Sequence, residues 1–275
     1  MPTPDIIVIG ASAGGIDALR AIVAGLPNHL SASVFVVMHT GPGSPGILDE
    51  LLRRAGPLPA ITAKDKKPIE DGYIYVAPPD LHLVIEPGRI RLTRGPKENR
   101  FRPAIDPLFR SAAQVYGPRV IGVILTGGLD DGTAGLWAVK RLGGIAVVQD
   151  PNDAFVPSMP LSALRHVDVD HTVPLAEIAP LLVKLTQTGV EEKGACEMPE
   201  HLDIEVKIAK QDPAINLDVR ELWEKSSYTC PECHGVLLRV KEGGRQRFRC
   251  HTGHAFSPDT LLADLTEGVE DAAER

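Results

Sequence analysis

Short runs of β-branched and other apolar residues alternate with amphipathic stretches of helical period over the first 190 residues of this chain. Such alternation is typical of βα units, in which each strand joins a parallel sheet and each helix covers one of its faces. The predicted strands are 6–9, 34–38, 120–126 and 145–149, and the predicted helices are 15–25, 46–54, 105–116, 132–142, 159–166 and 175–186. We therefore expect an α/β fold, with a doubly wound, mainly parallel sheet and helices on both faces.

Residues 61–94 follow a different pattern. Three apolar runs, GYIYVAP from 72, LHLVIE from 81 and RIRLTR from 89, are separated by turn pairs such as Pro87-Gly88. Closely spaced strands with turn residues between them indicate antiparallel pairing. This segment is expected to form an antiparallel β insertion or an edge of the sheet.

The distribution of charge divides the chain in two. Residues 1–190 contain equal numbers of acidic and basic residues, so the whole net charge of −7 belongs to residues 191–275. We expect a catalytic-type domain over 1–190, a linker over 191–225 with a helical stretch near 217–223, and a small module over 226–275. In that module, apolar runs at 236–240 and 247–250 flank a Gly-Gly turn and predict a hairpin, followed by a helix near 258–265.

Composition excludes several classes of function. No apolar run approaches the roughly 20 residues of a membrane helix, and the N-terminus has no pattern of an export signal, so a cytoplasmic protein with no membrane insertion is expected. The absence of a broadly basic region argues against nucleic acid as a partner.

A glycine-rich turn, GASAGG at 10–15, directly follows the first predicted strand and opens the first helix. Ligands of such folds bind at the carboxyl ends of strands. A dinucleotide site is disfavoured because Ser12 occupies the middle glycine position and the second strand ends without a carboxylate. The alternative is a nucleophile elbow, in which Ser12 is exposed and the N–H groups of Ala13 and Gly14 stabilise an oxyanion.

A serine nucleophile needs a base, and His39 ends the second predicted strand at the same edge of the sheet. The third strand ends in the segment TGGLDDGT at 126–133, where Asp130 or Asp131 can fix the tautomer of His39, as a catalytic triad requires. Taken singly, each of these residues also fits a helix cap or a structural role. Their positions after three strands favour catalysis, but physical reasoning leaves the choice of aspartate open.

Five segments together resemble the catalytic domain of the protein-glutamate methylesterases of bacterial chemotaxis, the CheB family. They are IGASAGG at 9–15, VVMH at 36–39, YVAPPD at 75–80, RFRPAIDPLF at 100–109 and LTGGLDDGTAG at 125–135. The resemblance implies hydrolysis of glutamate γ-methyl esters on chemoreceptors with release of methanol, deamidation of glutamines in many members, and no cofactor for catalysis. It also implies Ser12 as nucleophile, His39 as base and Asp131 as the orienting acid.

Two departures from the family pattern concern the oxyanion site and regulation. Gly128-Leu129 replaces the usual Met-Gly in a loop that the family places beside the oxyanion, and Ala13 replaces a frequent Thr. The first predicted strand begins near Ile6, so no receiver domain is expected in this sequence. The expectation that follows is a domain that is either constitutively active or controlled by a separate protein or by the chain's own C-terminal part.

A basic run leads into the segment RFRPAIDPLF at 100–109. Arg100 and Arg102 belong to it, together with Arg89, Arg91, Arg94 and Lys97. It is either a solvated loop or a surface that steers and docks an acidic receptor, with an effect that salt would screen.

The cysteine spacing in the last 50 residues predicts a zinc-ribbon-like module. Cys230 and Cys233 form one knuckle, and Cys250 and His254 the second, which is typical of a closed, structural tetrahedral zinc site. His234 and His251 are weaker candidates for the fourth ligand. A module of this size has little apolar core without a metal.

The combined hypothesis is a serine esterase acting on a methylated chemoreceptor or another methyl-esterified protein. Two alternatives remain: a related serine hydrolase with a different substrate, and a non-catalytic interaction protein whose pocket and zinc module bind partners.

Overall fold

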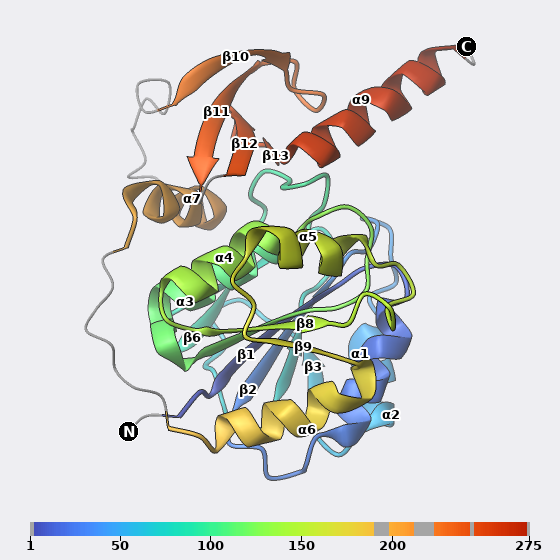
Figure 1. Ribbon diagram of the computed structural model, residues 1–275, viewed down its shortest axis with the longest axis vertical. Helices are drawn as coiled ribbons and strands as arrows, with labels where there is room; N and C mark the ends of the chain where they lie inside the picture. The colour runs from blue at the N-terminus through green and yellow to red at the C-terminus, as the bar shows by residue number, and fades with distance from the viewer. Residues whose placement is uncertain (1–2, 190–197, 212–222, 243–244, 274–275) are drawn as a thin grey trace.

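A seven-stranded sheet forms the larger part of the computed structural model, which describes residues 3–189, 198–211, 223–242 and 245–273 (Figure 1). All neighbouring strands in this sheet run parallel. In spatial order they are β3 (Ala60–Thr62), β4 (Ile74–Val76), β2 (Ser33–Met38), β1 (Ile6–Ala11), β7 (Val120–Ile124), β8 (Ile145–Gln149) and β9 (His171–Val173). The predicted parallel α/β sheet is confirmed.

Helices cover both faces of the sheet (Figure 1). One face carries α1 (Gly15–Gly25), α2 (Leu48–Ala55) and α6 (Leu175–Thr186), and the other carries α3 (Ile105–Tyr116), α4 (Thr133–Arg141) and α5 (Ser158–His166). Strand β1 is apolar throughout because both of its faces are buried. Ile7 and Ile9 pack into the core on the side of α1, α2 and α6, whereas Ile6 and Val8 pack into the core on the side of α3, α4 and α5. Successive side chains of a strand point to opposite faces, so a strand buried on both faces has no polar position.

The chain builds outward from β1 in two directions. It first adds β2, β4 and β3 on one side, and later β7, β8 and β9 on the other. The order therefore reverses at β1 and β7, and crevices for ligands form at such points, beyond the carboxyl ends of the strands. The turns that follow β1, β2 and β7 meet at this edge.

The segment 61–94 contains both an antiparallel hairpin and a strand of the main sheet. Strands β5 (His82–Glu86) and β6 (Arg89–Thr93) form the predicted antiparallel hairpin, which packs against α3. The run that begins at 72 instead supplies β4, a parallel strand of the main sheet beside β2. Strands β3 and β9 were not expected, because three residues are too few to show a periodicity. A 3-10 turn, η1 (Gly117–Arg119), precedes β7.

Helix α7 (Glu200–Lys210) lies within the segment that the sequence suggests is a linker. Leu202, Val206 and Ala209 are buried at helical spacing, and the helix packs against α3. Charged residues between these positions weaken the apolar pattern in the sequence, which is why the helix was not predicted. The helical stretch expected near 217–223 lies outside the described residues, apart from Trp223.

The C-terminal module, defined here as residues 223–273, has a four-stranded antiparallel sheet and a terminal helix. Its elements are β10 (Glu224–Thr229), β11 (Val236–Glu242), β12 (Arg245–Cys250), β13 (Ala255–Phe256) and α9 (Pro258–Ala273). The predicted β11–β12 pairing is confirmed, and α9 is longer than expected. The module lies on the side of the sheet that carries α3, α4 and α5, close to α7 (Figure 1). Among the described residues no helix is long and apolar enough to cross a membrane.

Candidate active site

Ser12 lies in the tight turn between β1 and α1. Its N–H donates to the carbonyl of Thr126 at 3.0 Å, which ties the turn to the loop after β7. Gly14 has φ of 77°, a left-handed conformation in which a side chain is strained, and a Cβ there would lie 2.7 Å from Cβ of Phe155. A Cβ on Gly127 would lie 2.8 Å from Cβ of Ser12. Glycine at position 14 lets Phe155 approach the turn, and glycine at position 127 lets the loop after β7 approach Ser12.

The structure brings Ser12, His39 and Asp131 together at the predicted edge. His39 Nδ1 lies 3.2 Å from Ser12 Oγ, and His39 Nε2 lies 2.7 Å from Asp131 Oδ2. The imidazole stacks on the ring of Phe101, with centroids 3.7 Å apart and planes 6° apart, and only 3% of the His39 side chain is exposed. The ring is therefore held in plane between a hydroxyl and a carboxylate, with Nδ1 toward the serine.

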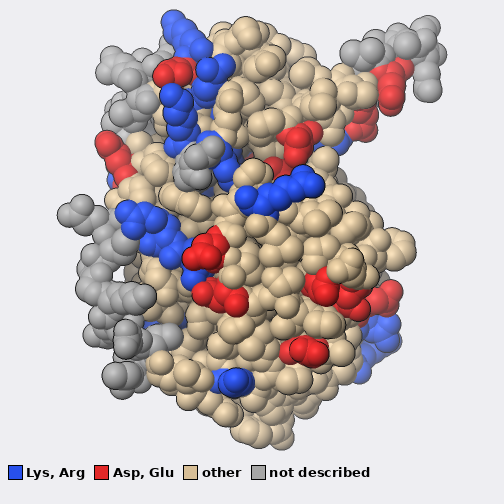
Figure 2. Space-filling model, viewed as in Figure 1, with Lys and Arg blue, Asp and Glu red and all other residues tan. Residues whose placement is uncertain are grey.

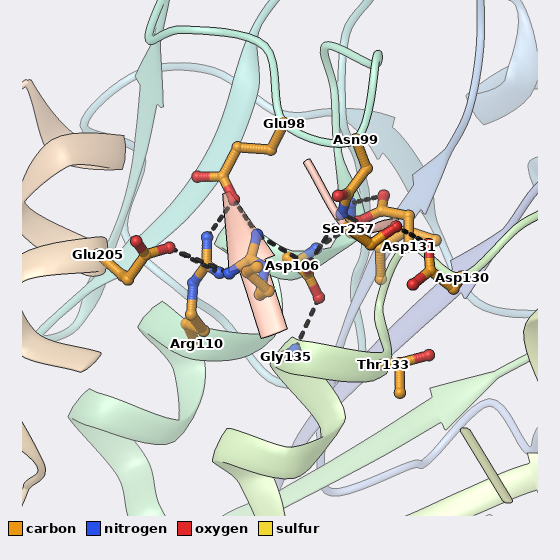
Figure 3. Close-up of polar contacts among 12 residues, drawn as sticks. Glu98, Asn99, Asp106, Arg110, Asp130, Asp131, Thr133, Gly135, Glu205 and Ser257 are labelled. Atoms are coloured by element: carbon orange, nitrogen blue, oxygen red, sulfur yellow. Dashed lines mark hydrogen bonds and ion pairs between the residues drawn. The ribbon is translucent and has the colours of Figure 1, made fainter. Parts of the chain in front are cut away.

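Three donors besides His39 hold Asp131: the side chain of Asn99, which lies beside it in Figure 3, and two backbone N–H groups. Its carboxylate accepts the N–H of Ile105 at 2.7 Å, the N–H of Asp106 at 3.4 Å and Nδ2 of Asn99 at 2.8 Å. The two backbone donors belong to the first turn of α3, where the helix dipole favours an anion. Burial raises the pKa of Asp131, but the hydrogen bond and charge of His39, with the bonds from Ile105 and Asn99, outweigh it and lower the pKa. The group therefore stays ionised.

Asp130 points away from His39. It accepts hydrogen bonds from Oγ of Ser257 at 2.7 Å and from Arg245 at 3.1 Å, both in the C-terminal module. Burial raises its pKa to about 6, against the opposing effects of Ser257 and Arg245. The geometry thus separates the two neighbouring aspartates that the sequence alone could not distinguish.

Backbone amides beside Ser12 are available for an anion. Within the described residues, no hydrogen bond of the protein uses the N–H of Ala13, Gly14 or Gly128. Ala13 and Gly14 lead into α1, and the loop that contains Gly128 passes against Ser12 at Gly127. Unpaired N–H groups at a helix N-terminus form a natural anion site.

A sequence profile of the CheB methylesterase family matches residues 7–182. The chain belongs to the CheB methylesterase family. It is therefore a member of a hydrolase family, and its matched part contains the whole Ser12–His39–Asp131 cluster.

Curated relatives agree with this assignment. A protein of Leptospira interrogans named as a putative protein-glutamate methylesterase/protein-glutamine glutaminase is 41% identical over 188 residues, which cover 68% of this chain and 97% of the relative. A Pyrococcus horikoshii protein-glutamate methylesterase/protein-glutamine glutaminase is 34% identical over 191 residues, covering 68% of this chain and 52% of the relative. This chain thus spans about half the length of the second protein and nearly all of the first.

A solved structure supports the fold of this CheB methylesterase domain. The crystal structure of the Thermotoga maritima CheB methylesterase catalytic domain superposes with a TM-score of 0.64 at 34% identity, covering 66% of this chain and 99% of that domain. The C-terminal module is additional to the region that these comparisons cover.

An apolar groove of about 210 Å³ adjoins the cluster. Met38 and Thr40, the neighbours of His39, line one end of it, and Ile16 of α1 lines another part. Ile47 and Leu51 on the α2 side complete the apolar wall. The groove is thus an apolar surface that is lined in part by the two sequence neighbours of His39.

Arg100 and Arg102 make ion pairs within the chain instead of presenting free charge. Arg102 donates Nε and Nη2 to Asp80 at 2.8 and 2.6 Å, and Arg100 pairs with Asp264 at 2.9 Å and with Glu267. The other cations of the run are paired as well, with Glu86, Asp80 and Glu232. Figure 2 shows acidic and basic side chains interspersed on one face of the molecule. The run is therefore paired with acids close to it in the sequence, such as Glu86, and with distant acids, such as Glu232 and Glu267.

Cys230, Cys233, Cys250 and His254 form a cluster in the C-terminal module, with their ligand atoms within 4.8 Å of one another. The distance from Cys233 Sγ to Cys250 Sγ is 3.6 Å, and His254 Nδ1 lies 3.7 Å from Cys230 Sγ and 3.5 Å from Cys250 Sγ. Tetrahedral zinc with Zn–S bonds of about 2.3 Å places sulfur atoms about 3.8 Å apart. The donor set therefore fits a zinc ion, whereas His234 and His251 are not part of the cluster.

Three residues near the cluster were not found from the sequence as parts of the site: Asn99, Phe101 and Asp106. Phe101 covers the imidazole, and Asn99 joins Asp131 to Asp106 through its Nδ2. The only available signal was their place in the 100–109 motif and just before it. Asn99 has φ of 49° and Arg100 has φ of 77°, and asparagine tolerates this conformation better than most residues.

Proposed function

We propose that this protein hydrolyses γ-methyl esters of glutamate side chains and deamidates glutamine side chains, with Ser12 as the nucleophile. The observation that carries the proposal is the continuous chain from Ser12 Oγ through His39 to Asp131, in a member of the CheB methylesterase family. Relatives that are named both as methylesterases and as glutaminases support the two reactions.

In the first step, Ser12 Oγ attacks the γ-carbonyl carbon while His39 Nδ1 accepts the hydroxyl proton. Asp131 holds the Nε2 proton, which leaves the lone pair of Nδ1 directed at the serine. The negative charge that develops on the carbonyl oxygen is stabilised by the N–H groups of Ala13, Gly14 and Gly128. Collapse of the tetrahedral intermediate breaks the bond to the methoxy group, and His39 returns its proton to release methanol.

In the second step, water hydrolyses the glutamyl ester on Ser12. His39 Nδ1 accepts a proton from the water, whose oxygen attacks the same carbonyl carbon. The Ser12 Oγ–carbon bond breaks, Oγ recovers the proton from His39, and the product is an unmodified glutamate. For a glutamine substrate the leaving group is ammonia, and the water step is the same.

The substrate is proposed to be a methyl-esterified protein, with a methylated chemoreceptor as the first candidate. The apolar groove beside His39 supports a polypeptide substrate, because a lone methyl ester does not require an apolar surface that extends from Met38 to Ile47. A cytoplasmic location and control by a separate regulatory protein belong to the same proposal. The free thiols of the module are consistent with a reducing compartment.

We further propose that zinc binds Cys230, Cys233, Cys250 and His254. Four protein donors close the coordination shell, so the ion would stabilise the module and take no part in the ester chemistry. In this proposal residues 1–190 form the catalytic domain, 191–225 connect it with the module, and 226–275 form the zinc-ribbon-like module.

Substitution Ser12→Ala tests the proposed function. We expect turnover of a methyl-esterified receptor peptide to fall by about 10³-fold or more, since the other members of a triad cannot replace the nucleophile. Methanol release measures the reaction, and an unchanged melting temperature shows that the fold persists. Ester turnover that survives Ser12→Ala would contradict the proposal.

A further inference from the structure

A dense set of polar contacts joins the C-terminal module to the loop that supports Asp131. We propose that the module is a positioning element for the active site: it holds Asn99 and Asp106 in place, and these two residues hold Asp131 against His39. The inference rests on the proposed function, because it assigns a role relative to the Ser12–His39–Asp131 cluster. It concerns residues outside the region that the CheB methylesterase profile matches.

Two backbone hydrogen bonds join the loop 97–100 to β13 of the module. The N–H of Asn99 donates to the carbonyl of Ala255 at 2.8 Å, and the N–H of Ala255 donates to the carbonyl of Lys97 at 3.2 Å. Strand β13 thereby extends its sheet onto residue 98 through a parallel bridge. Asn99 and Arg100 have positive φ, a conformation that persists when surrounding structure imposes it. The module supplies that structure.

Six buried charged side chains lie beneath this pairing, each 3% exposed or less. They are Glu98 of the loop, Asp106 and Arg110 of α3, Glu205 of α7, and Arg247 and Arg249 of β12. Arg247 lies 3.5 Å from Asp106, 3.3 Å from Glu98 and 3.1 Å from Glu205. Removing one partner from such a buried group leaves an uncompensated charge, which is strongly unfavourable. Arg247 and Arg249 are therefore specific anchors and not parts of a surface basic patch.

The anchor reaches the catalytic aspartate in two hydrogen bonds (Figure 3). Asp106 Oδ2 accepts Asn99 Nδ2 at 3.0 Å, and the same Nδ2 donates to Asp131 Oδ1 at 2.8 Å. The N–H of Gly135 holds the other oxygen of Asp106 at 2.7 Å. Arg247 thus contacts the carboxyl group that orients Asn99, and Asn99 orients the carboxylate that orients His39.

The nucleophile remains accessible with the module in place. Ala13 is exposed, Ser12 is partly exposed, and the Phe155 side chain beside Gly14 is 80% exposed. The contacts of the module described above fall on the loop 97–100, on Asp106, on Asp130 and on Glu205 of α7, and none of these contacts is made to Ser12 or His39. This arrangement supports the site instead of blocking it.

Arg247→Met in the full chain tests the proposal, because it removes the charge and keeps much of the side-chain volume. We expect kcat for a small methyl ester to fall about 10- to 100-fold, since small misplacements of a catalytic group have effects of this size, while KM changes less than about twofold. Arg239→Met is the matched control, because Arg239 lies on β11 of the same module and pairs with Glu224. An unchanged or raised kcat in Arg247→Met would overturn the proposal.

A double-mutant cycle with Asn99→Ala separates positioning from general destabilisation. If Arg247 acts through Asn99, Arg247→Met lowers kcat much less in the Asn99→Ala background than in the wild type. If the two substitutions act independently, so that the double variant loses the product of the two single-variant factors in kcat, the proposal is contradicted. Should Arg247→Met not fold, Arg247→Lys serves in the same cycle, with a smaller expected loss because the charge is retained.

A measurement without substrate distinguishes this inference from the proposed function. The His39 Nε2 proton, which is bonded to Asp131, should exchange slowly with water in the wild type and at least tenfold faster in Arg247→Met, as followed by proton NMR. Equal exchange rates would overturn the positioning role. Failure of the wild type to cleave any ester would refute the proposed function and leave this result intact.

Discussion

Large clusters of buried apolar side chains flank the seven-stranded sheet on both faces, whereas the apolar cluster of the C-terminal module has six residues. Two of those six, Cys230 and Cys250, also belong to the proposed zinc site. The module meets the rest of the protein through buried ion pairs and a strand bridge. The sheet domain is thus stabilised by apolar burial, whereas the module has a small apolar cluster, polar docking contacts and the proposed zinc site.

The largest expected effect is on the module alone. Removing zinc with a chelator, or Cys250→Ser, should abolish protection of the β11 and β12 amides from hydrogen exchange, because structural zinc supplies on the order of 10 kcal/mol in small modules. Amides of β1 and β7 should keep their protection and serve as the internal control. Zinc content should fall from about one ion per chain to none. A module that stays protected without metal would remove the distinction between the two regions.

A substitution in the apolar core should destabilise the sheet domain and leave the zinc content of the module unchanged. Phe109 of α3 is fully buried, so Phe109→Ala should lower the free energy of unfolding of the sheet domain by about 3–5 kcal/mol. Zinc content should not change. Phe155→Ala removes an 80% exposed ring and is expected to alter stability by less than about 0.5 kcal/mol. Denaturant unfolding followed by circular dichroism measures both variants, and similar losses would show that burial does not control stability here.

Asp130 is the carboxylate of the sheet domain that the module holds through Ser257 and Arg245. Its pKa is raised from 3.8 to about 6, mainly by burial, so the folded state binds this proton more tightly than the unfolded state. The free energy of unfolding should therefore decrease as pH rises from about 4 to about 6, by at most about 3 kcal/mol. Asp130→Asn should remove this decrease, as measured by urea unfolding across that pH range. Identical slopes in variant and wild type would contradict the raised pKa.

The smallest effect is expected at the exposed margin of the interface. Arg100 pairs with Glu267, whose side chain is 61% exposed, and such pairs contribute about 0–1 kcal/mol. Arg100→Gln should therefore lower the melting temperature only slightly, as measured by calorimetry. A large loss would show that docking depends on the rim of the interface as much as on its buried arginines.

The elements that the sequence predicts correctly are those with a strong local signal. Strand β1 is apolar at every position, the glycines around Ser12 mark a turn, and the spacing of Cys230, Cys233, Cys250 and His254 indicates the cluster that these side chains form. Helix α7 and the short strands β3 and β9 have no such signal. Helix α7 packs against α3, and β3 and β9 are defined as strands only by their hydrogen bonds to β4 and β8.

The active site shows the same division at the level of single residues. The sequence placed Ser12, His39 and the Asp130-Asp131 pair after three strands, at one edge of the sheet. It could not say which aspartate faces the imidazole, because that depends on the path of the backbone after β7. It also did not associate Asn99 or Arg247 with the site, since hydrogen bonds and ion pairs between distant segments leave no periodic pattern.

The sequence by itself thus determined the parallel sheet, the residue types at the edge where Ser12 and His39 lie, and the Cys-His cluster of the module, because each depends on spacing within a short segment. Only the tertiary structure decided that Asp131 orients His39, that Asp130 faces the module, and that the arginines of β12 are buried against acids of α3 and α7. The physical reason is that side-chain charges interact through space, and a linear pattern does not record which distant partners the fold brings within 3–4 Å.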